Sequence, residues 1–190
     1  MERNFFLYNL RDAFSRDSCR KIVEKIAQTE LTNNKIRLAH DRNGKPYLKH
    51  DRYYTSYSHA NDSLFVAFSE SPIGVDFEHE DRRRELEDIR EYAFSGKDLV
   101  PYSINLLELW CLKEASLKKK RLGFLFANPN EYTIAADDRR YELKKGDKTI
   151  DRGFYVIAKE EQCVFAICSV ININNYKIIK EDYKNVYFGI

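Results

Sequence analysis

Apolar and polar positions follow two different periods along this chain of 190 residues, and the periods predict both strands and helices. An apolar residue at every second position is typical of a strand that buries one face, whereas spacings of three and four residues are typical of a helix with one apolar face. Strands are expected at residues 5–10, 36–39, 53–57, 64–68, 73–78, 131–135, 140–144, 154–159 and 164–170. Helices are expected from Ser15 to about residue 30, at residues 82–92, and from Ser103 to about residue 120, with the two serines as N-caps.

The order of these segments predicts an α+β fold of two lobes, each built from a helix and antiparallel strands. Residues 1–80 are expected to form a short N-terminal lobe and residues 81–190 a C-terminal lobe, with no long linker between them. The spacing of Tyr57 from the apolar residues 64–68 is similar to that of Tyr155 from residues 164–167, which suggests an internal repeat. No element is assigned from residue 172 onward.

Composition narrows the class of protein. Apolar content of 43% and aromatic content of 14% exclude a disordered chain, and the net charge of +2 gives no argument for a nucleic-acid partner. No apolar run approaches the roughly 20 residues of a membrane span, and no signal-peptide pattern is present, so a cytoplasmic protein without a membrane partner is expected. The cysteines are interpreted as reduced core residues because they lie in apolar segments and form no CxxC pair. They are Cys19, Cys111, Cys163 and Cys168.

Three carboxylates occur where folding alone would not place them. In a strand over residues 73–78, Asp76 and Glu78 share one face while Val75 and Phe77 share the other. Glu114 falls inside the apolar stripe of the long helix expected before residue 120. A carboxylate buried there without a partner costs several kcal/mol, so a divalent cation bound by the three acids would resolve the problem.

Five short motifs, in this order and spacing, resemble the two-lobed 4′-phosphopantetheinyl transferases over about residues 36–126. They are Gly44-Lys45-Pro46, Ser58-His59, Gly74-Val75-Asp76-Phe77-Glu78, Phe94-Ser95 with Asp98, and Trp110 followed by Lys113-Glu114-Ala115 and Lys118. The resemblance implies two similar helix-plus-antiparallel-sheet lobes related by pseudo-twofold symmetry, with the active site in the cleft between them. It also implies an enzyme that moves the phosphopantetheine arm of coenzyme A to a serine of an apo acyl or peptidyl carrier protein, with 3′,5′-adenosine bisphosphate leaving.

The same resemblance implies roles for individual residues. Asp76, Glu78 and Glu114 would bind Mg²⁺, or Mn²⁺ in its place, and Glu114 would also act as the base for the serine proton. Lys118 would be a second catalytic group that stabilises negative charge on the phosphates. The residues expected to bind coenzyme A are Lys45, Pro46, Ser58, His59, Lys113 and Lys118. A monomer is expected.

Each assignment has a structural alternative. Asp76 and Glu78 could lie on a solvated strand face, and Glu114 and Lys118 could form an ordinary surface ion pair at i,i+4. His59 could be a structural histidine. Lys45 could be an exposed turn lysine, and residues 118–121 could be a solvated helix end whose cations favour the helix dipole.

Two departures from the resembled family also count. Arg121 stands where the family commonly has the first glycine of a Gly-x-Gly loop, and arginine lacks glycine's backbone freedom. Fewer than 45 residues precede Gly44, so basic residues that would hold the 3′-phosphate of coenzyme A are not identifiable by motif. These departures leave open a non-catalytic homologue that binds coenzyme A or a carrier protein. A nucleotide- or nucleic-acid-binding module using residues 82–84 and 118–121 is the third alternative.

Overall fold

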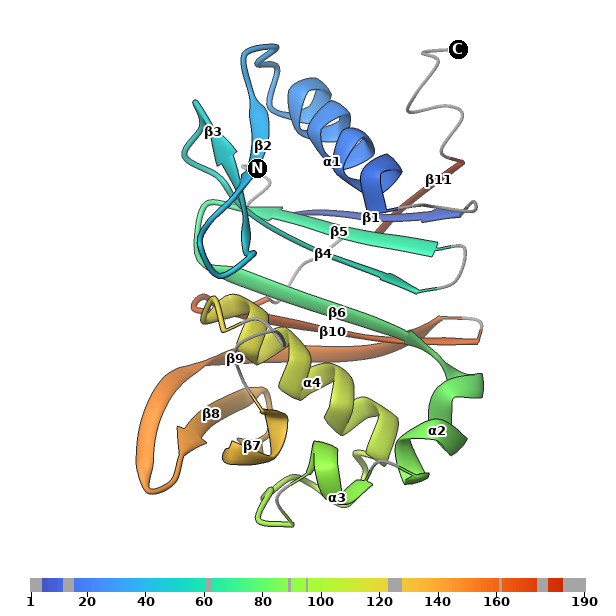
Figure 1. Ribbon diagram of the computed structural model, residues 1–190, viewed down its shortest axis with the longest axis vertical. Helices are drawn as coiled ribbons and strands as arrows, with labels where there is room; N and C mark the ends of the chain where they lie inside the picture. The colour runs from blue at the N-terminus through green and yellow to red at the C-terminus, as the bar shows by residue number, and fades with distance from the viewer. Residues whose placement is uncertain are drawn as a thin grey trace.

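The computed structural model describes residues 5–11, 16–60, 63–88, 90–94, 96–122, 128–160, 162–173 and 178–182. In these residues the chain is an α+β protein with two larger sheets, a two-stranded sheet and two long helices (Figure 1). The predicted α+β class is confirmed. No helix of the described residues has the length and apolar character needed to cross a membrane.

The first sheet has the strand order β11-β1-β5-β4. Its strands are β1 (Phe5–Arg11), β4 (Tyr54–Ala60), β5 (Ser63–Ser69) and β11 (Ile178–Asp182). β5 pairs antiparallel with both β1 and β4, whereas β11 pairs parallel with β1. The C-terminal segment to which the sequence assigned no element therefore supplies an edge strand, because it adds to a sheet whose other strands lie more than 100 residues earlier.

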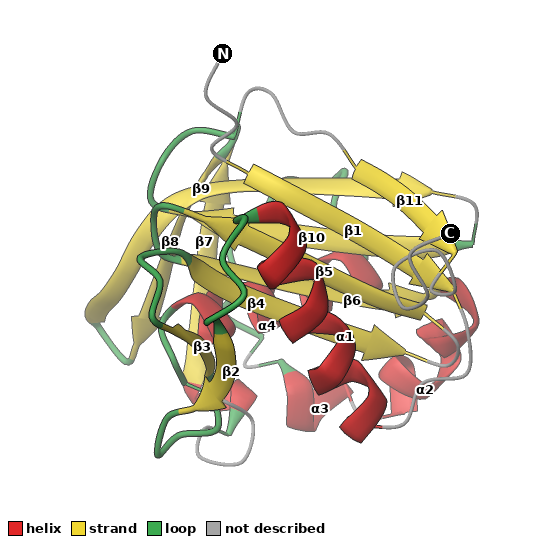
Figure 2. Ribbon diagram, turned by 90° about the horizontal axis from the view of Figure 1, so that it is seen from above, coloured by secondary structure: helices red, strands yellow, loops and turns green. Residues whose placement is uncertain are grey.

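Helix α1 (Arg16–Glu30) covers the outer face of this sheet. Its buried residues Ile22, Val23 and Ile26 pack in one apolar cluster with Leu64, Val66 and Phe68 of β5, as the helical and strand periods predict. The small hairpin of β2 (Arg37–His40) and β3 (Pro46–Lys49) joins the cluster through Leu38 and Leu48. Figure 2 shows α1 lying across the sheet with this hairpin beside it. The expected N-cap Ser15 lies outside the described residues.

The second sheet is antiparallel throughout and has the strand order β6-β10-β9-β8-β7. Its strands are β6 (Ile73–His79), β7 (Tyr132–Asp137), β8 (Arg140–Lys145), β9 (Lys148–Glu160) and β10 (Cys163–Ser169). Three short helical segments lie between β6 and the next long helix, and a fourth directly precedes β7. They are η1 (Glu80–Arg82), α2 (Arg83–Asp88), α3 (Arg90–Ala93) and η2 (Pro129–Glu131).

Helix α4 (Leu106–Lys119) covers the outer face of the second sheet. Its N-cap is Asn105, whose side chain accepts a hydrogen bond from the backbone of Glu108 while the Glu108 carboxylate accepts one from the Asn105 backbone. This capping box shows that the predicted cap Ser103 was wrong by two residues. The apolar residues of α4 pack on Val164, Ala166 and Cys168 of β10.

The two sheets face each other, so the molecule has the layer order helix, sheet, sheet, helix (Figure 1). Phe65 of β5 packs against Phe77 of β6 and Phe165 of β10 in a third apolar cluster between the sheets. Because side chains alternate along a strand, β5 sends Leu64 and Phe68 toward α1 and Phe65 toward the second sheet. By the same alternation β6 sends Phe77 toward the first sheet and its acidic residues toward α4.

Both sheets share an order of elements. In each, a strand is followed by a long helix and then by a hairpin whose second strand pairs back onto that first strand, giving β1-β5-β4 and β6-β10-β9. Sheet membership does not follow a division at residue 80, since β6 belongs to the second sheet and β11 to the first.

Candidate functional site

Asp76 of β6 is the centre of a buried polar cluster at the junction of β4, β6 and α4. It is 3% exposed, and its Oδ1 accepts hydrogen bonds from the Ser58 hydroxyl at 2.8 Å and from Lys118 Nζ at 2.5 Å. Lys118 Nζ also donates to the Ser58 oxygen at 3.1 Å. Three elements distant in sequence thus meet at one carboxylate, and three of the predicted site residues are in contact.

Glu78 lies two residues along the same strand and is 7% exposed. One nitrogen of the Arg82 guanidinium donates to both of its oxygens at 2.7 and 2.8 Å, and the Trp110 indole N–H donates to Oε1 at 3.3 Å. Burial raises the pKa of Glu78, the charge of Asp76 raises it further, and Arg82 lowers it. The solvated strand face considered from the sequence is therefore excluded for both acids.

Glu114 completes the cluster from α4 and is 5% exposed. Burial raises its pKa well above the usual range, and the neighbouring Asp76 charge raises it further, which places the two carboxylates within electrostatic reach of each other. Burial opposes the charge of Lys118 as well, but Asp76 and Glu114 hold the pKa of that ammonium above its ordinary value. Glu114 and Lys118 are thus not an ordinary surface pair.

Two carboxylate oxygens of the cluster are buried and have no hydrogen-bond partner in the described part of the chain, Asp76 Oδ2 and Glu114 Oε1. Buried polar atoms in folded proteins almost always have a partner, so these two fit an electropositive ligand. No group of three acidic, histidine or cysteine side chains is arranged as a ready metal cage among the described residues. The donor set still suits Mg²⁺, because that ion is usually held by one or two carboxylates together with substrate phosphates and water.

A close approach of β6 and α4 holds this cluster together. A Cβ added to Gly74 would overlap the carbonyl oxygen of Ala115 and the backbone nitrogen of Lys119. Glycine therefore lets the helix backbone lie directly on the strand, which brings Glu114 and Lys118 of the helix over Asp76 of the strand.

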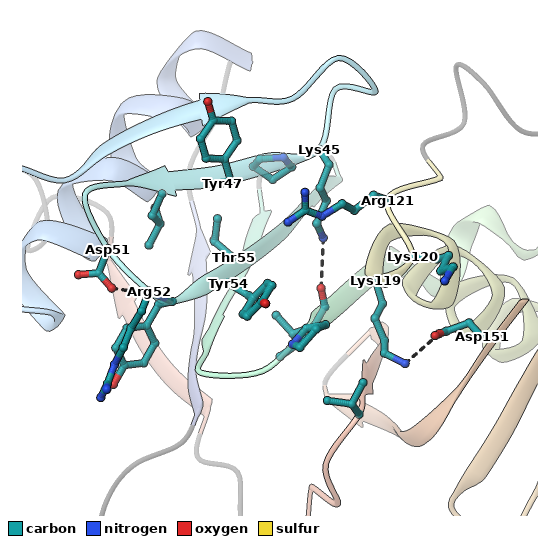
Figure 3. Close-up of a pocket in the computed structure, with 16 residues that line it drawn as sticks. Lys45, Tyr47, Asp51, Arg52, Tyr54, Thr55, Lys119, Lys120, Arg121 and Asp151 are labelled. Atoms are coloured by element: carbon teal, nitrogen blue, oxygen red, sulfur yellow. Dashed lines mark hydrogen bonds and ion pairs between the residues drawn. The ribbon is translucent and has the colours of Figure 1, made fainter.

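A pocket of about 510 Å³ lies between the first sheet and the C-terminal end of α4 (Figure 3), and Ile73 and Lys119 line it from the two elements that carry the acidic cluster. Its lining includes tyrosines 47, 53 and 54 and the cations Lys45, Arg52, Lys119, Lys120 and Arg121. Two of these cations are neutralised, Lys119 by Asp151 at 2.8 Å and Arg52 by Glu70 at 2.6 Å. Lys45 and Arg121 lie together at the upper edge in Figure 3.

Lys45 and Pro46, both predicted to bind coenzyme A, line this pocket. Lys45 Nζ donates to the carbonyl oxygen of Ile73 at 3.1 Å. Burial lowers the pKa of Lys45 to about 7, and the positive charges of Lys118 and Arg121 contribute to the shift. The exposed turn lysine considered from the sequence does not describe this side chain.

The remaining predicted residues are not brought into the cluster. His59 follows Ser58 on β4 and is exposed on the opposite face of the strand. Lys113 is 1% exposed and buried on α4, where its Nζ pairs with Asp98 at 3.3 Å. Asp98 also accepts a hydrogen bond from the backbone of Ile134, so this pair ties α4 to β7 rather than reaching the phosphate of a ligand in the pocket.

Arg82, Thr55 and Arg121 were not assigned to the site from the sequence. Arg82 follows Glu78 by four residues, and an acid-to-arginine spacing across the end of a strand is the signal that could have indicated the pair. Thr55 and Arg121 reach the pocket only because α4 ends beside β4, and no local pattern indicates that.

Searches of protein-family models and of curated protein sequences found no match to this chain.

Proposed function

We propose that this protein is a Mg²⁺-dependent 4′-phosphopantetheinyl transferase, which moves the phosphopantetheine arm of coenzyme A to a serine of an acyl or peptidyl carrier protein. The observation that carries the proposal is the pair of buried, unpartnered carboxylate oxygens on Asp76 and Glu114. They come from two of the five resembled motifs, on β6 and α4, and the same two elements contribute residues to a pocket lined by several cations.

The fold supports the proposal through its two matching units. The orders β1-β5-β4 and β6-β10-β9, each with a long helix between its first strand and its hairpin, are what two lobes related by pseudo-twofold symmetry would have. The cluster lies where the units meet, because Ser56 and Ser58 of β4 hydrogen-bond to the backbone of Val75 and to Asp76 of β6.

Asp76 and Glu114 would hold the metal ion, with Glu78 beside them. Bound there, Mg²⁺ would neutralise charge on the pyrophosphate of coenzyme A. Glu78 is satisfied by Arg82 and Trp110, so in this arrangement its carboxylate is an oriented neighbour whose charge adds to the field of the site.

The reaction is attack by the carrier serine oxygen on the β-phosphorus of coenzyme A, with cleavage of the bond to the bridging oxygen and departure of 3′,5′-adenosine bisphosphate. Glu114 would take the serine proton, and its raised pKa makes its ionised form a stronger base than an exposed carboxylate. Lys118, which stays charged, would stabilise negative charge that develops on the phosphates.

The test is to incubate the protein with coenzyme A, Mg²⁺ and a panel of apo carrier proteins and to measure the intact mass of each carrier. A gain of one phosphopantetheine on at least one carrier, lost when the carrier serine is replaced by alanine, is the expected result. Coenzyme A binding without a mass gain on any carrier would overturn the enzyme in favour of a non-catalytic coenzyme A-binding homologue. Salt-sensitive oligonucleotide binding without coenzyme A binding would favour the nucleic-acid module instead.

A further inference from the structure

Arg121 has an unfavourable backbone conformation for its residue type. Its φ is +64°, in the left-handed region that only glycine adopts without a steric penalty. The position is C′ of α4, because Arg121 N–H donates to Lys118 and Leu122 N–H donates to Leu117, the two hydrogen bonds of a Schellman motif. Glycine is the residue that this motif favours, so arginine here lowers stability relative to glycine.

The side chain of Arg121 has a defined place in spite of this. It lies beside Lys45 at the edge of the pocket (Figure 3), 51% exposed, and its nearest acidic group is Asp41 at a loose 3.7 Å. The Asn43 side chain donates to the Arg121 carbonyl oxygen at 3.3 Å, which fixes the end of α4 against the loop that carries Lys45. The arrangement holds two cations next to each other with one carboxylate to share.

The pocket also contains a polar group prepared for a ligand. Thr55 is 1% exposed, lines the pocket, and its hydroxyl has no hydrogen-bond partner in the described residues. A bound anion that accepts several hydrogen bonds would reduce the repulsion between Lys45 and Arg121. It would also give the Thr55 hydroxyl a hydrogen-bond partner. A phosphomonoester has this chemistry.

The position of the pocket indicates which phosphate would bind. Ile73 lines the pocket, and its carbonyl oxygen accepts from Lys45, three residues before Asp76 on the same strand, so the pocket and the acidic cluster share β6. If the protein acts on coenzyme A as proposed above, the pyrophosphate must lie at the acidic cluster, where the chemistry occurs. The remaining anionic group of coenzyme A is its 3′-phosphate, which would then fall in the pocket.

We infer that Arg121 contacts the 3′-phosphate of coenzyme A and determines the preference of this protein for the 3′-phosphorylated ligand, with Lys45 and Thr55 as its partners. This inference rests on the proposed function for its ligand. It assigns a binding role to a residue at a position where the resembled enzymes have glycine, and it explains why an arginine is kept in left-handed backbone.

The test compares coenzyme A with 3′-dephospho-coenzyme A, which differ only in this phosphate. Arg121→Gln removes the charge and keeps a side chain with a Cβ, so the backbone penalty is unchanged. By calorimetry we expect it to weaken coenzyme A binding about tenfold and 3′-dephospho-coenzyme A binding by less than about twofold. Arg42→Gln is the matched control, because Arg42 is exposed in the same loop as Lys45 and does not line the pocket, and it should change neither affinity.

A second variant separates binding from folding. Arg121→Gly should weaken coenzyme A binding to the same extent as Arg121→Gln while raising the melting temperature of the free protein by roughly 2–4 °C, because glycine suits the left-handed position. Loss of affinity in a variant that is more stable cannot come from unfolding.

Equal losses for both ligands, or no loss for either, would overturn the role of Arg121 even if the wild-type protein modifies a carrier. Failure of the wild-type protein to bind either ligand would also overturn it. Selective loss of coenzyme A binding in a protein that modifies no carrier would support the role of Arg121 and overturn the proposed transferase activity.

Discussion

Gly74 of β6 lies directly against the backbone of Ala115 on α4, so closely that the helix would have to move to admit a single methyl group. The contact sets the separation between the strand that carries Asp76 and the helix that carries Glu114. Gly74, which has no side chain, therefore sets the relative position of Asp76 and Glu114.

Replacing Gly74 by alanine should test this relationship. The new Cβ would meet backbone atoms, which cannot rotate away, so we expect a loss of about 3 kcal/mol in the free energy of unfolding measured by urea denaturation. Gly146→Ala is the control, since a Cβ there meets no atom within 4 Å and only its positive φ of 55° is unfavourable, which costs about 1 kcal/mol. Equal losses in the two variants would show that the close approach is not what Gly74 provides.

Glu114→Gln should raise stability and abolish transfer. The pKa of Glu114 is raised in the folded protein, so above its ordinary value the folded state holds a proton that the unfolded state has lost, and stability falls as pH rises. Glutamine removes this dependence, and the variant should therefore be more stable than the wild type at pH 7, with the difference shrinking toward pH 4. Carrier modification should fall by about 10²–10⁴-fold.

Thermal unfolding at several pH values and the carrier mass assay measure these two effects. Glu131→Gln, which neutralises an exposed acid paired with Lys145, should change neither. A Glu114→Gln variant that modified carriers at the wild-type rate would remove Glu114 from the proposed base role.

Lys113→Met should lower stability without weakening coenzyme A binding by the folded protein. The substitution leaves Asp98 as an unpaired acid in a largely buried position, which costs about 3–5 kcal/mol when the partner of a buried pair is removed. The double variant Lys113→Met with Asp98→Asn should recover much of the loss, because Asn retains an oxygen that can accept from the Ile134 backbone. Chemical denaturation gives the stabilities. A Lys113→Met variant that binds coenzyme A more weakly but is as stable as the wild type would contradict the structural role.

Lys45 should make stability depend on pH above neutrality. Its pKa is about 7 in the folded protein and near 10.5 in the unfolded chain, so between these values the unfolded state binds more protons and stability rises with pH. Lys45→Met should remove this contribution, so that the stability difference between variant and wild type narrows as pH increases from about 7 to about 10. A difference that stays constant over this range would show that Lys45 keeps its ordinary pKa.

The sequence by itself determined the elements and their buried faces. The continuous apolar run of residues 64–68 reflects burial of both faces of a strand, and the helical spacing of Ile22, Val23 and Ile26 reflects burial of one helix face. The same argument identified Glu114 as a carboxylate inside an apolar stripe, which the structure shows as a buried residue.

Only the tertiary structure decided which of the candidate residues meet. Lys113 and Lys118 both belong to one motif on one helix, yet Lys113 pairs with Asp98 in the core while Lys118 reaches Asp76 and Ser58. The parallel edge strand β11 and the pocket formed by Lys45, Thr55 and Arg121 likewise depend on contacts between segments far apart in the chain. Such contacts are set by the packing of whole elements, and side-chain patterns within a segment carry little information about them.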